Sequence, residues 1–229
     1  MNTTDKHNPV TGEIYHVFTK SIAGFRIFDD DDEFFRIKEI SRYYQQKDLA
    51  LKFSRFKELQ ERLEIKPKPI TLDERIVDII VYCFMPTHIH LILKQLEDRA
   101  ISVYMNNILN SYTRYFNIRH KRKGPLWEGR FKKVLMVTDE QLLHLTRYIH
   151  LNPVTAHIIE KPEQWGASSY NEYLNKGHFE YRITFFENVL DIITSDYKEF
   201  VEDRKDYQRE LKEIEYMLLE NPHSTYAVE

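Results

Sequence analysis

Residues 75–94 have the sequence RIVDIIVYCFMPTHIHLILK, which decides the centre of the fold. The first ten residues form a nearly continuous apolar run, as expected for a buried strand. MPT follows as a short link, and HIHLILK has the composition of a second strand. These features predict a tight antiparallel hairpin over residues 75–94.

Two histidines interrupt the apolar sequence of the second strand. Alternate residues of a strand point to the same face, so His88 and His90 project side by side while Ile89 points into the core. Imidazoles placed in this way can chelate one divalent ion through nitrogen. Two unrelated histidines on a half-exposed strand are the alternative interpretation. Two ligands also leave a metal under-coordinated, so the metal hypothesis requires a third protein group.

A predicted helix supplies candidates for that group. It lies within TDEQLLHLTRYIHLNP, which begins at Thr138, and we expect it to end before Pro153 because the residue before a proline avoids the helical region. His144, Tyr148 and Asn152 are spaced i, i+4 and i+8, so they form one stripe along this helix. Asn152 offers an amide oxygen as a ligand, and Tyr148 offers a phenol.

These groups together suggest a reaction on a phosphodiester. A metal bound by two histidines and an amide would polarise a phosphate oxygen. The phenol oxygen of Tyr148 would then attack phosphorus and form a covalent phosphotyrosine. Since the covalent bond conserves the energy of the broken one, a second DNA end could be joined without ATP. This chemistry suits strand transfer better than hydrolysis.

The remaining segments predict a mixed α/β fold of the α+β type. Further strands are expected at residues 14–23 and 131–137, and helices at 31–45, 48–63 and 99–118, with Phe35 among the inward residues of the first helix. KPKP at residues 66–69 is expected to break the second helix. The acidic run at residues 29–33 suits the amino-terminal end of a helix.

Charge is unevenly distributed along the chain. The formal net charge is −3, but residues 176–229 hold 7 Lys or Arg and 13 Asp or Glu, which leaves +3 for the rest. Basic side chains concentrate in residues 119–133, a pattern that fits a phosphate backbone as well as a solvated loop. Trp127, in the same stretch, could stack on an unpaired base or pack against the core. The candidate DNA-binding residues are Arg119, Lys121, Arg122, Lys123, Trp127, Arg130, Lys132 and Lys133.

The composition also limits the class of protein. Hydrophobic residues make up 42 % of the chain, but no stretch has the roughly 20 apolar residues that a membrane span needs. The start of the chain lacks the basic and then apolar order of a signal peptide. Cys83 is the single cysteine, which excludes an internal disulfide and a multi-thiolate metal site. We therefore expect a cytoplasmic protein.

Five separated motifs, in order, resemble a known family. YHVFTKSIAGFRIFDDDDEFF, MPTHIHLIL, GPLWEGRFKK, LTRYIHLNPVTAHII and PEQWGASSYNEYL look like the single-tyrosine HUH transposases, and most like the REP-associated tyrosine transposases. The resemblance covers roughly residues 10–175. Thr87 departs from it, because relatives often have asparagine at that position.

This resemblance implies a fold, a substrate and a set of site residues. It implies a central antiparallel sheet carrying the histidine pair, with helices on one face and the tyrosine on a separate helix. Members cleave and rejoin single-stranded DNA, often beside a hairpin, with Mg²⁺ or Mn²⁺, and form a 5′-phosphotyrosine. Carried over to this sequence, the metal ligands are His88 and His90, the nucleophile is Tyr148, and Asn152 is the additional metal ligand.

Other interpretations stay open at this point. A metal-dependent nuclease could use water at the same site, and a regulator descended from a transposase could bind DNA or RNA without cleaving it. We predict a transposase domain at residues 1–175 and an acidic helical extension at residues 176–229. A monomer is slightly favoured over a homodimer.

Overall fold

The structure is a computed structural model that describes residues 8–65, 70–176, 182–190 and 194–203. Its centre is one four-stranded antiparallel sheet with strand order β2-β3-β1-β4. The strands are β1 (Ile14–Lys20), β2 (Val77–Met85), β3 (His88–Gln95) and β4 (Lys132–Leu135). The sheet agrees with the predicted fold class.

The hairpin predicted from residues 75–94 is confirmed. β2 and β3 pair in antiparallel fashion, with Met85 opposite His88, and the link between them is the two-residue turn of Pro86 and Thr87. All nine residues of β2 are buried, which explains why its sequence is apolar throughout rather than alternating.

The pairing of β1 with β3 sets which residues of β1 lie beside the two histidines. Phe18 lies opposite His90, and Lys20 lies opposite His88. Residues directly opposite each other in an antiparallel pair have side chains on the same face. The side chains of Phe18 and Lys20 therefore share a face of the sheet with the two histidines.

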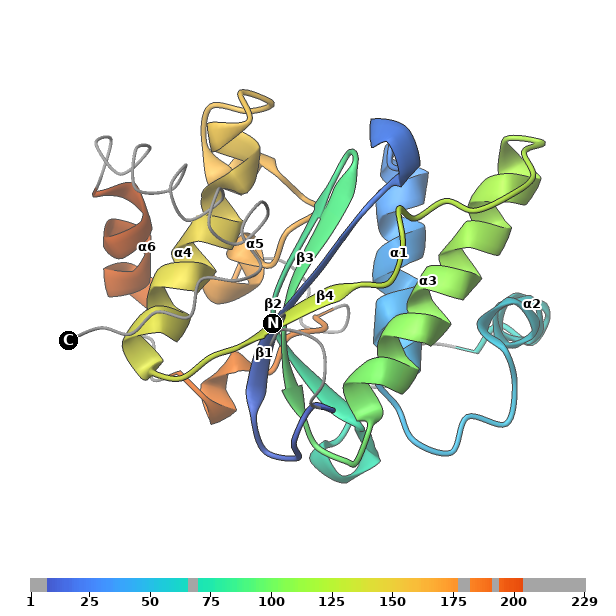
Figure 1. Cartoon of the computed structure of the whole chain (residues 1–229), viewed down its shortest axis with the longest axis horizontal. Helices are drawn as coiled ribbons and strands as arrows, with labels where there is room; N and C mark the ends of the chain where they lie inside the picture. Colours follow the sequence, from blue (N-terminus) through green and yellow to red (C-terminus); the bar gives the residue numbers. More distant parts are fainter. Residues whose placement is uncertain (1–7, 66–69, 177–181, 191–193, 204–229) are drawn as a thin grey trace, which may run out of the picture.

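Helices cover both faces of the sheet, as Figure 1 shows. The α1 and α3 helices lie on one side, and α4, α5 and α6 lie on the other. The expectation of helices on one face was wrong, because β2 and β3 are apolar on both faces and each face needs cover. The helices are α1 (Asp31–Tyr44), α2 (Phe53–Arg62), α3 (Ala100–Arg119), α4 (Asp139–Thr155), α5 (Tyr170–Tyr173) and α6 (Thr194–Glu202).

Two hydrophobic clusters follow from this three-layer arrangement. Ile89 and Leu91 point to the cluster that contains the inner residues of α1 and α3. Cys83 and Ile92 point to the opposite cluster, which contains Leu145 and other residues of α4. The histidine pair lies on this opposite side of the sheet, where it faces α4.

Two local expectations about the helices were wrong. Phe35 is half exposed, whereas Ile37 and Ile40 are buried on the inner face of α1 as expected. The α4 helix does not end before Pro153 but continues through it to Thr155. Proline removes one backbone donor, yet the next turn persists because the amide of Ala156 donates to the carbonyl of Asn152.

Part of the predicted C-terminal extension packs on the core. Tyr197 and Val201 of α6 are buried in the cluster that also holds α4. The helix predicted for the remainder, residues 204–229, lies outside the described residues, as does the KPKP stretch. The domain boundary at residue 175 stays a prediction. No helix in the described ranges is long and apolar enough to cross a membrane.

Burial predicts the cost of truncating β3. Ile89 is fully buried, so Ile89→Ala should lower the free energy of unfolding by about 2–5 kcal/mol through lost burial and a residual cavity. Ile118, which is 80 % exposed on α3, provides the matched control, and Ile118→Ala should change it by less than about 0.5 kcal/mol. Denaturant unfolding measures both. Equal effects would contradict the assignment of Ile89 to the core.

Candidate active site

The histidine pair lies at the start of β3, directly after the turn. His90 is 1 % exposed, and His88 is partly exposed at the end of the hairpin. Their ring centroids are 5.0 Å apart and their planes are nearly perpendicular, at 88°. The strand therefore holds the two imidazoles close together and unstacked, and this arrangement is compatible with both rings binding one metal ion.

Tyr148 approaches this pair from α4. Its ring centroid lies 6.0 Å from that of His90, with the planes at 88°, and the residue is 3 % exposed. Tyr148 belongs to the hydrophobic cluster between α4 and the sheet. The structure thus brings together the phenol and the imidazole pair, which are some 60 residues apart in the chain.

A third histidine, His16, fixes the orientation of His90. Nε2 of His16 lies 3.0 Å from Nδ1 of His90, and the two rings stack at 5.3 Å. The sequence alone favours a structural role for His16 on the first strand, because its contact with His90 depends on the register of β1 against β3. The signal available in the sequence was its place in a predicted strand with alternating Ile14, His16 and Phe18.

The ring nitrogens of the pair are arranged in a way that suits a bound metal ion. With Nδ1 of His90 engaged by His16, Nε2 of His90 is buried and has no hydrogen-bond partner in the described part of the chain. Nδ1 of His88 lies 3.0 Å from Oγ1 of Thr87. Each imidazole is therefore held through Nδ1, the arrangement that presents Nε2 to a metal.

Burial keeps these imidazoles neutral. It lowers the pKa of His88 to about 4, with a smaller contribution from the charge of Lys20. Burial also lowers the pKa of His90 well below its usual range, and that of His16 to about 3. Neutral imidazole is the form that binds a metal ion. A proton on Nδ1 of His90, donated to His16, would leave the lone pair of Nε2 available.

The donor set fits a divalent ion only with help from other oxygen atoms. Among the described residues, no group of three or more His, Cys, Asp and Glu side chains is placed to hold a metal. Asn152 is 9 % exposed, one helical turn after Tyr148, and its amide nitrogen has no partner in the described ranges. Two imidazoles, one amide and oxygens from a substrate would suit such an ion.

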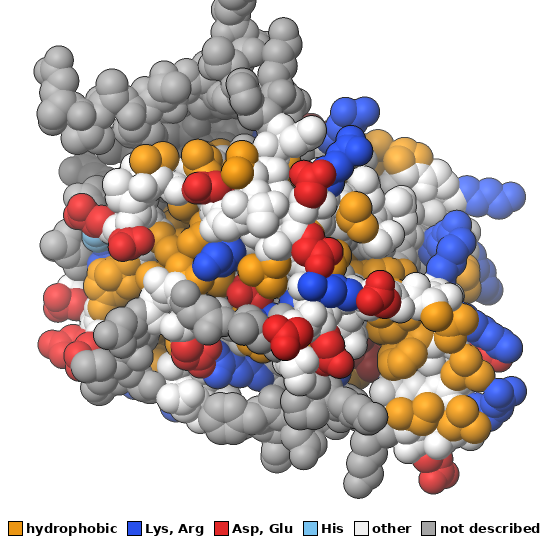
Figure 2. Space-filling view, turned by 90° about the horizontal axis from the view of Figure 1, so that it is seen from below, with side chains coloured by type: hydrophobic (Ala, Val, Ile, Leu, Met, Phe, Trp, Pro, Cys, Tyr) orange, Lys and Arg blue, Asp and Glu red, His pale blue; other side chains and the backbone are white. Residues whose placement is uncertain are grey.

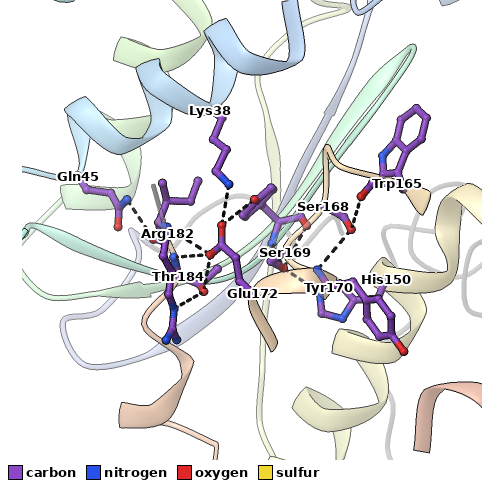
Figure 3. Close-up of polar contacts among 12 residues, drawn as sticks. Lys38, Gln45, His150, Trp165, Ser168, Ser169, Tyr170, Glu172, Arg182 and Thr184 are labelled. Atoms are coloured by element: carbon purple, nitrogen blue, oxygen red, sulfur yellow. Dashed lines mark hydrogen bonds and ion pairs between the residues drawn. The ribbon is translucent and has the colours of Figure 1, made fainter. Parts of the chain in front are cut away.

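A buried hydrogen-bond chain fixes α4 from its other side. Nε2 of His150 lies 2.7 Å from Oγ of Ser169, and its Nδ1 lies 2.7 Å from the hydroxyl oxygen of Tyr197. That hydroxyl donates to Oγ1 of Thr146 at 2.9 Å. The chain joins α4 to α5 and α6, and Figure 3 shows His150 pointing toward the serines.

A second polar cluster closes the outer edge of β2. Glu172 of α5 accepts from Nζ of Lys38 at 2.8 Å, from the hydroxyl of Tyr82 at 2.9 Å and from Thr184 (Figure 3). A buried carboxylate needs such partners to offset its desolvation. The cluster ties α1 and the segment at residues 182–184 to the sheet, so it supports the scaffold and lies apart from the histidine pair.

His144, one turn before Tyr148, is engaged elsewhere. Its Nδ1 lies 2.8 Å from the guanidinium of Arg147, its Nε2 lies 3.8 Å from a carboxylate oxygen of Glu140, and its ring contacts Phe200 of α6. We therefore do not assign it a role in the reaction.

Several of the candidate DNA-binding residues have partners within the protein. Arg119 bonds Asp30 at the start of α1 and the hydroxyl of Tyr115. Arg122 bonds Asn117 and the carbonyl of Pro125. The carboxylate of Asp30 offsets the charge of Arg119, and the contacts of Arg122 occupy part of its hydrogen-bond donors.

Trp127 packs against the core, which was one of its two predicted alternatives. Its indole nitrogen lies 3.0 Å from Oγ1 of Thr113 and 3.2 Å from the carbonyl of Leu109, and its ring packs on the core under α3. Figure 2 shows one face of the molecule, on which basic, acidic and hydrophobic side chains are mixed. Lys121, Lys123, Arg130 and Lys132 are exposed, as is Arg119, and Lys133 is partly exposed on β4.

Part of the chain is similar to known transposases. Residues 53–152 match the model of the family described as "Transposase IS200 like". A curated protein of Haemophilus influenzae, assigned to the REP-associated tyrosine transposases, is 26 % identical over 104 residues. That alignment covers 41 % of this chain and 59 % of the relative, so the chain spans about three-fifths of its length. The resemblance to single-tyrosine transposases is confirmed.

Two solved structures are also similar to the chain. One, of a REP-associated tyrosine transposase bound to a REP hairpin, has a TM-score of 0.49 at 14 % identity and covers 84 % of this chain and 99 % of that one. The other, from Deinococcus radiodurans R1 and assigned as a transposase, has a TM-score of 0.35 at 13 % identity and covers 64 % and 95 %.

The His150 chain yields a prediction about stability. Tyr197→Phe removes one hydroxyl and leaves Nδ1 of His150 without its buried partner, so the free energy of unfolding should fall by about 1–3 kcal/mol. Tyr115→Phe, at a partly exposed position, is the control and should cost less than about 1 kcal/mol. Chemical denaturation of both variants makes the comparison. A neutral Tyr197→Phe would mean that α6 does not hold α4.

Proposed function

We propose that this protein is a metal-dependent endonuclease and strand transferase for single-stranded DNA, a transposase that acts through a covalent 5′-phosphotyrosine at Tyr148. The observation that carries the proposal is the 6.0 Å approach of the Tyr148 ring to His90, whose Nε2 is buried without a partner in the described residues. The family match supports the same class of activity.

His88, His90 and Asn152 would hold the ion, Mg²⁺ or Mn²⁺. When bound, such an ion supplies charge stabilisation to a phosphate oxygen. Within the chain, His16 and Thr87 hold the two imidazoles in place through their Nδ1 atoms. The low pKa values of both imidazoles keep them available as ligands rather than as cations at neutral pH.

Tyr148 would supply the nucleophile. Its phenol oxygen forms a bond to the phosphorus of the scissile phosphodiester, and the bond from phosphorus to the 3′ oxygen breaks. The phenol proton passes to solvent, and the departing oxygen takes up a proton to become a 3′ hydroxyl. Burial of α4 against the sheet limits movement of the ring, which favours an oriented attack.

Rejoining reverses the same step with another strand. A 3′ hydroxyl attacks the phosphotyrosine, the new phosphodiester forms, and the phenol of Tyr148 is restored. The substrate that suits this chemistry is single-stranded DNA, with the cleavage site beside a hairpin. Exposed lysines of residues 119–133 would contact its backbone, and affinity should therefore fall with rising salt.

Covalent capture of DNA tests the proposal. With labelled single-stranded hairpin DNA and Mn²⁺, the wild-type protein should form an adduct that survives a denaturing gel. Tyr148→Phe should abolish the adduct because the attacking oxygen is gone, and His88→Ala should reduce it by at least about 100-fold because a metal ligand is lost.

Tyr115→Phe is the matched control for the nucleophile, since Tyr115 is partly exposed on α3 and should leave the adduct intact. An adduct that persists in Tyr148→Phe would refute the assignment of the nucleophile. Cleavage without an adduct in the wild-type protein would indicate a nuclease that uses water. Binding without cleavage would indicate a silent regulator.

The role of His16 can be tested by metal binding alone. His16→Leu removes the partner of Nδ1 of His90, so affinity for Mn²⁺ should weaken by about 10- to 100-fold. Electron paramagnetic resonance of free Mn²⁺ during a titration measures the affinity. The control is His157→Asn, at an exposed position whose positive φ asparagine tolerates. An unchanged affinity in His16→Leu would contradict the proposed orientation of His90.

A further inference from the structure

Lys20 occupies a position beside the imidazole pair to which neither the motifs nor the comparisons assign a role. It is the last residue of β1 and lies directly opposite His88 in the antiparallel register. Its side chain is exposed, whereas its neighbours Thr19 and Ser21 are buried. The side chain of Lys20 therefore leaves the sheet on the same face as the histidines and is exposed to solvent.

The backbone at Lys20 is held firmly. Its carbonyl accepts a hydrogen bond from the amide of Glu128 at 3.0 Å, and the next amide, of Ser21, donates to the carbonyl of Thr87 at 2.8 Å. The strand end is thus fastened both to the turn before His88 and to the segment after Trp127. Because the backbone is fixed at this position, the Lys20 side chain can reach only a small region around the histidine pair.

The charge of Lys20 is not neutralised by an acid. Within the described ranges its ammonium group has no ion pair and no hydrogen bond, whereas Arg119 is surrounded by Asp30, Asp32 and Glu33. Its field reaches the site, because it is one of the causes that lower the pKa of both His88 and His90.

A cation without an acidic partner next to a metal site is favourable only when an anion binds beside it. Alone, it repels a divalent ion at the imidazoles and so weakens metal binding slightly. During attack by Tyr148, however, negative charge accumulates on the oxygens of the phosphate. A lysine is well suited to meet that charge, because its ammonium is a compact point charge with three donors.

We propose that Lys20 is a further catalytic residue, which contacts a non-bridging oxygen of the scissile phosphate from the end of β1. The assignment rests on the proposed function. The phosphate would lie beside the imidazole pair, which Tyr148 approaches from α4 and Lys20 from the end of β1. Lys20 stabilises the charge that develops during both cleavage and rejoining.

The test separates rate from affinity. At saturating single-stranded hairpin DNA and saturating Mn²⁺, Lys20→Met should slow adduct formation by about 100-fold, the loss typical for removal of one charge-stabilising group. Lys20→Arg should restore much of the rate because the charge is kept. The affinity of Lys20→Met for Mn²⁺, without DNA, should be equal to or tighter than that of the wild-type protein.

Lys94→Met is the matched control. Lys94 lies on the same face of the sheet, opposite Ile14 at the far end of the same strand pair, and should leave the rate unchanged. Wild-type rates in Lys20→Met, or weaker DNA binding with an unchanged saturating rate, would overturn the assignment of Lys20 alone. If the wild-type protein forms no adduct, the proposed function and this inference fall together. Thermal melting should show all three variants folded.

Discussion

The antiparallel register between β1 and β3 is the constraint on which the site depends. It sets His16 next to His90, and Lys20 opposite His88, on the face of the sheet that α4 covers. A slip of β1 by one residue would turn His16 and Lys20 to the other face, away from His88 and His90. Val17, at an alternate position of β1, is fully buried in the cluster on that other face, so the slip would also remove it from this cluster and is strongly disfavoured.

The placement of the phenol depends on a second set of contacts. Residues two apart in a helix point about 200° apart, so Tyr148 faces the histidines while His150 faces α5 and α6. The helix is thus packed against the sheet on one side and held by a satisfied chain of hydrogen bonds on the other. Because Tyr197 lies beyond residue 175, part of the predicted acidic extension takes part in fixing the helix that carries the candidate nucleophile.

Local patterns allowed much of this arrangement to be predicted. Alternation in a strand places His88 and His90 on one face, and the short turn and apolar runs predict the hairpin. The acidic run was correctly interpreted as helix capping, since Asp30 accepts from the amide of Glu33. The proximity of Tyr148 to this pair was a chemical hypothesis supported by family resemblance, because no local pattern states where a helix packs on a sheet.

What the sequence did not reveal depends on contacts between distant segments. His16 and Lys20 carry no motif of their own, and their closeness to the pair follows only from strand register. The basic stretch looked like a uniform surface, but the same acidic run that caps α1 also engages Arg119 from another helix. Helices cover both faces because buried strands need cover on both sides, a point that the apolar β2 sequence already contained.

Anomalous scattering from Mn²⁺ tests the central claim most directly, because it locates the ion without reference to activity. Crystals of the wild-type protein grown with Mn²⁺ should show one strong peak bonded to Nε2 of His88 and Nε2 of His90, on the side of the rings that faces Tyr148. A peak bonded elsewhere, or none at the pair despite bound manganese in solution, would contradict the account that these imidazoles and the phenol form one centre.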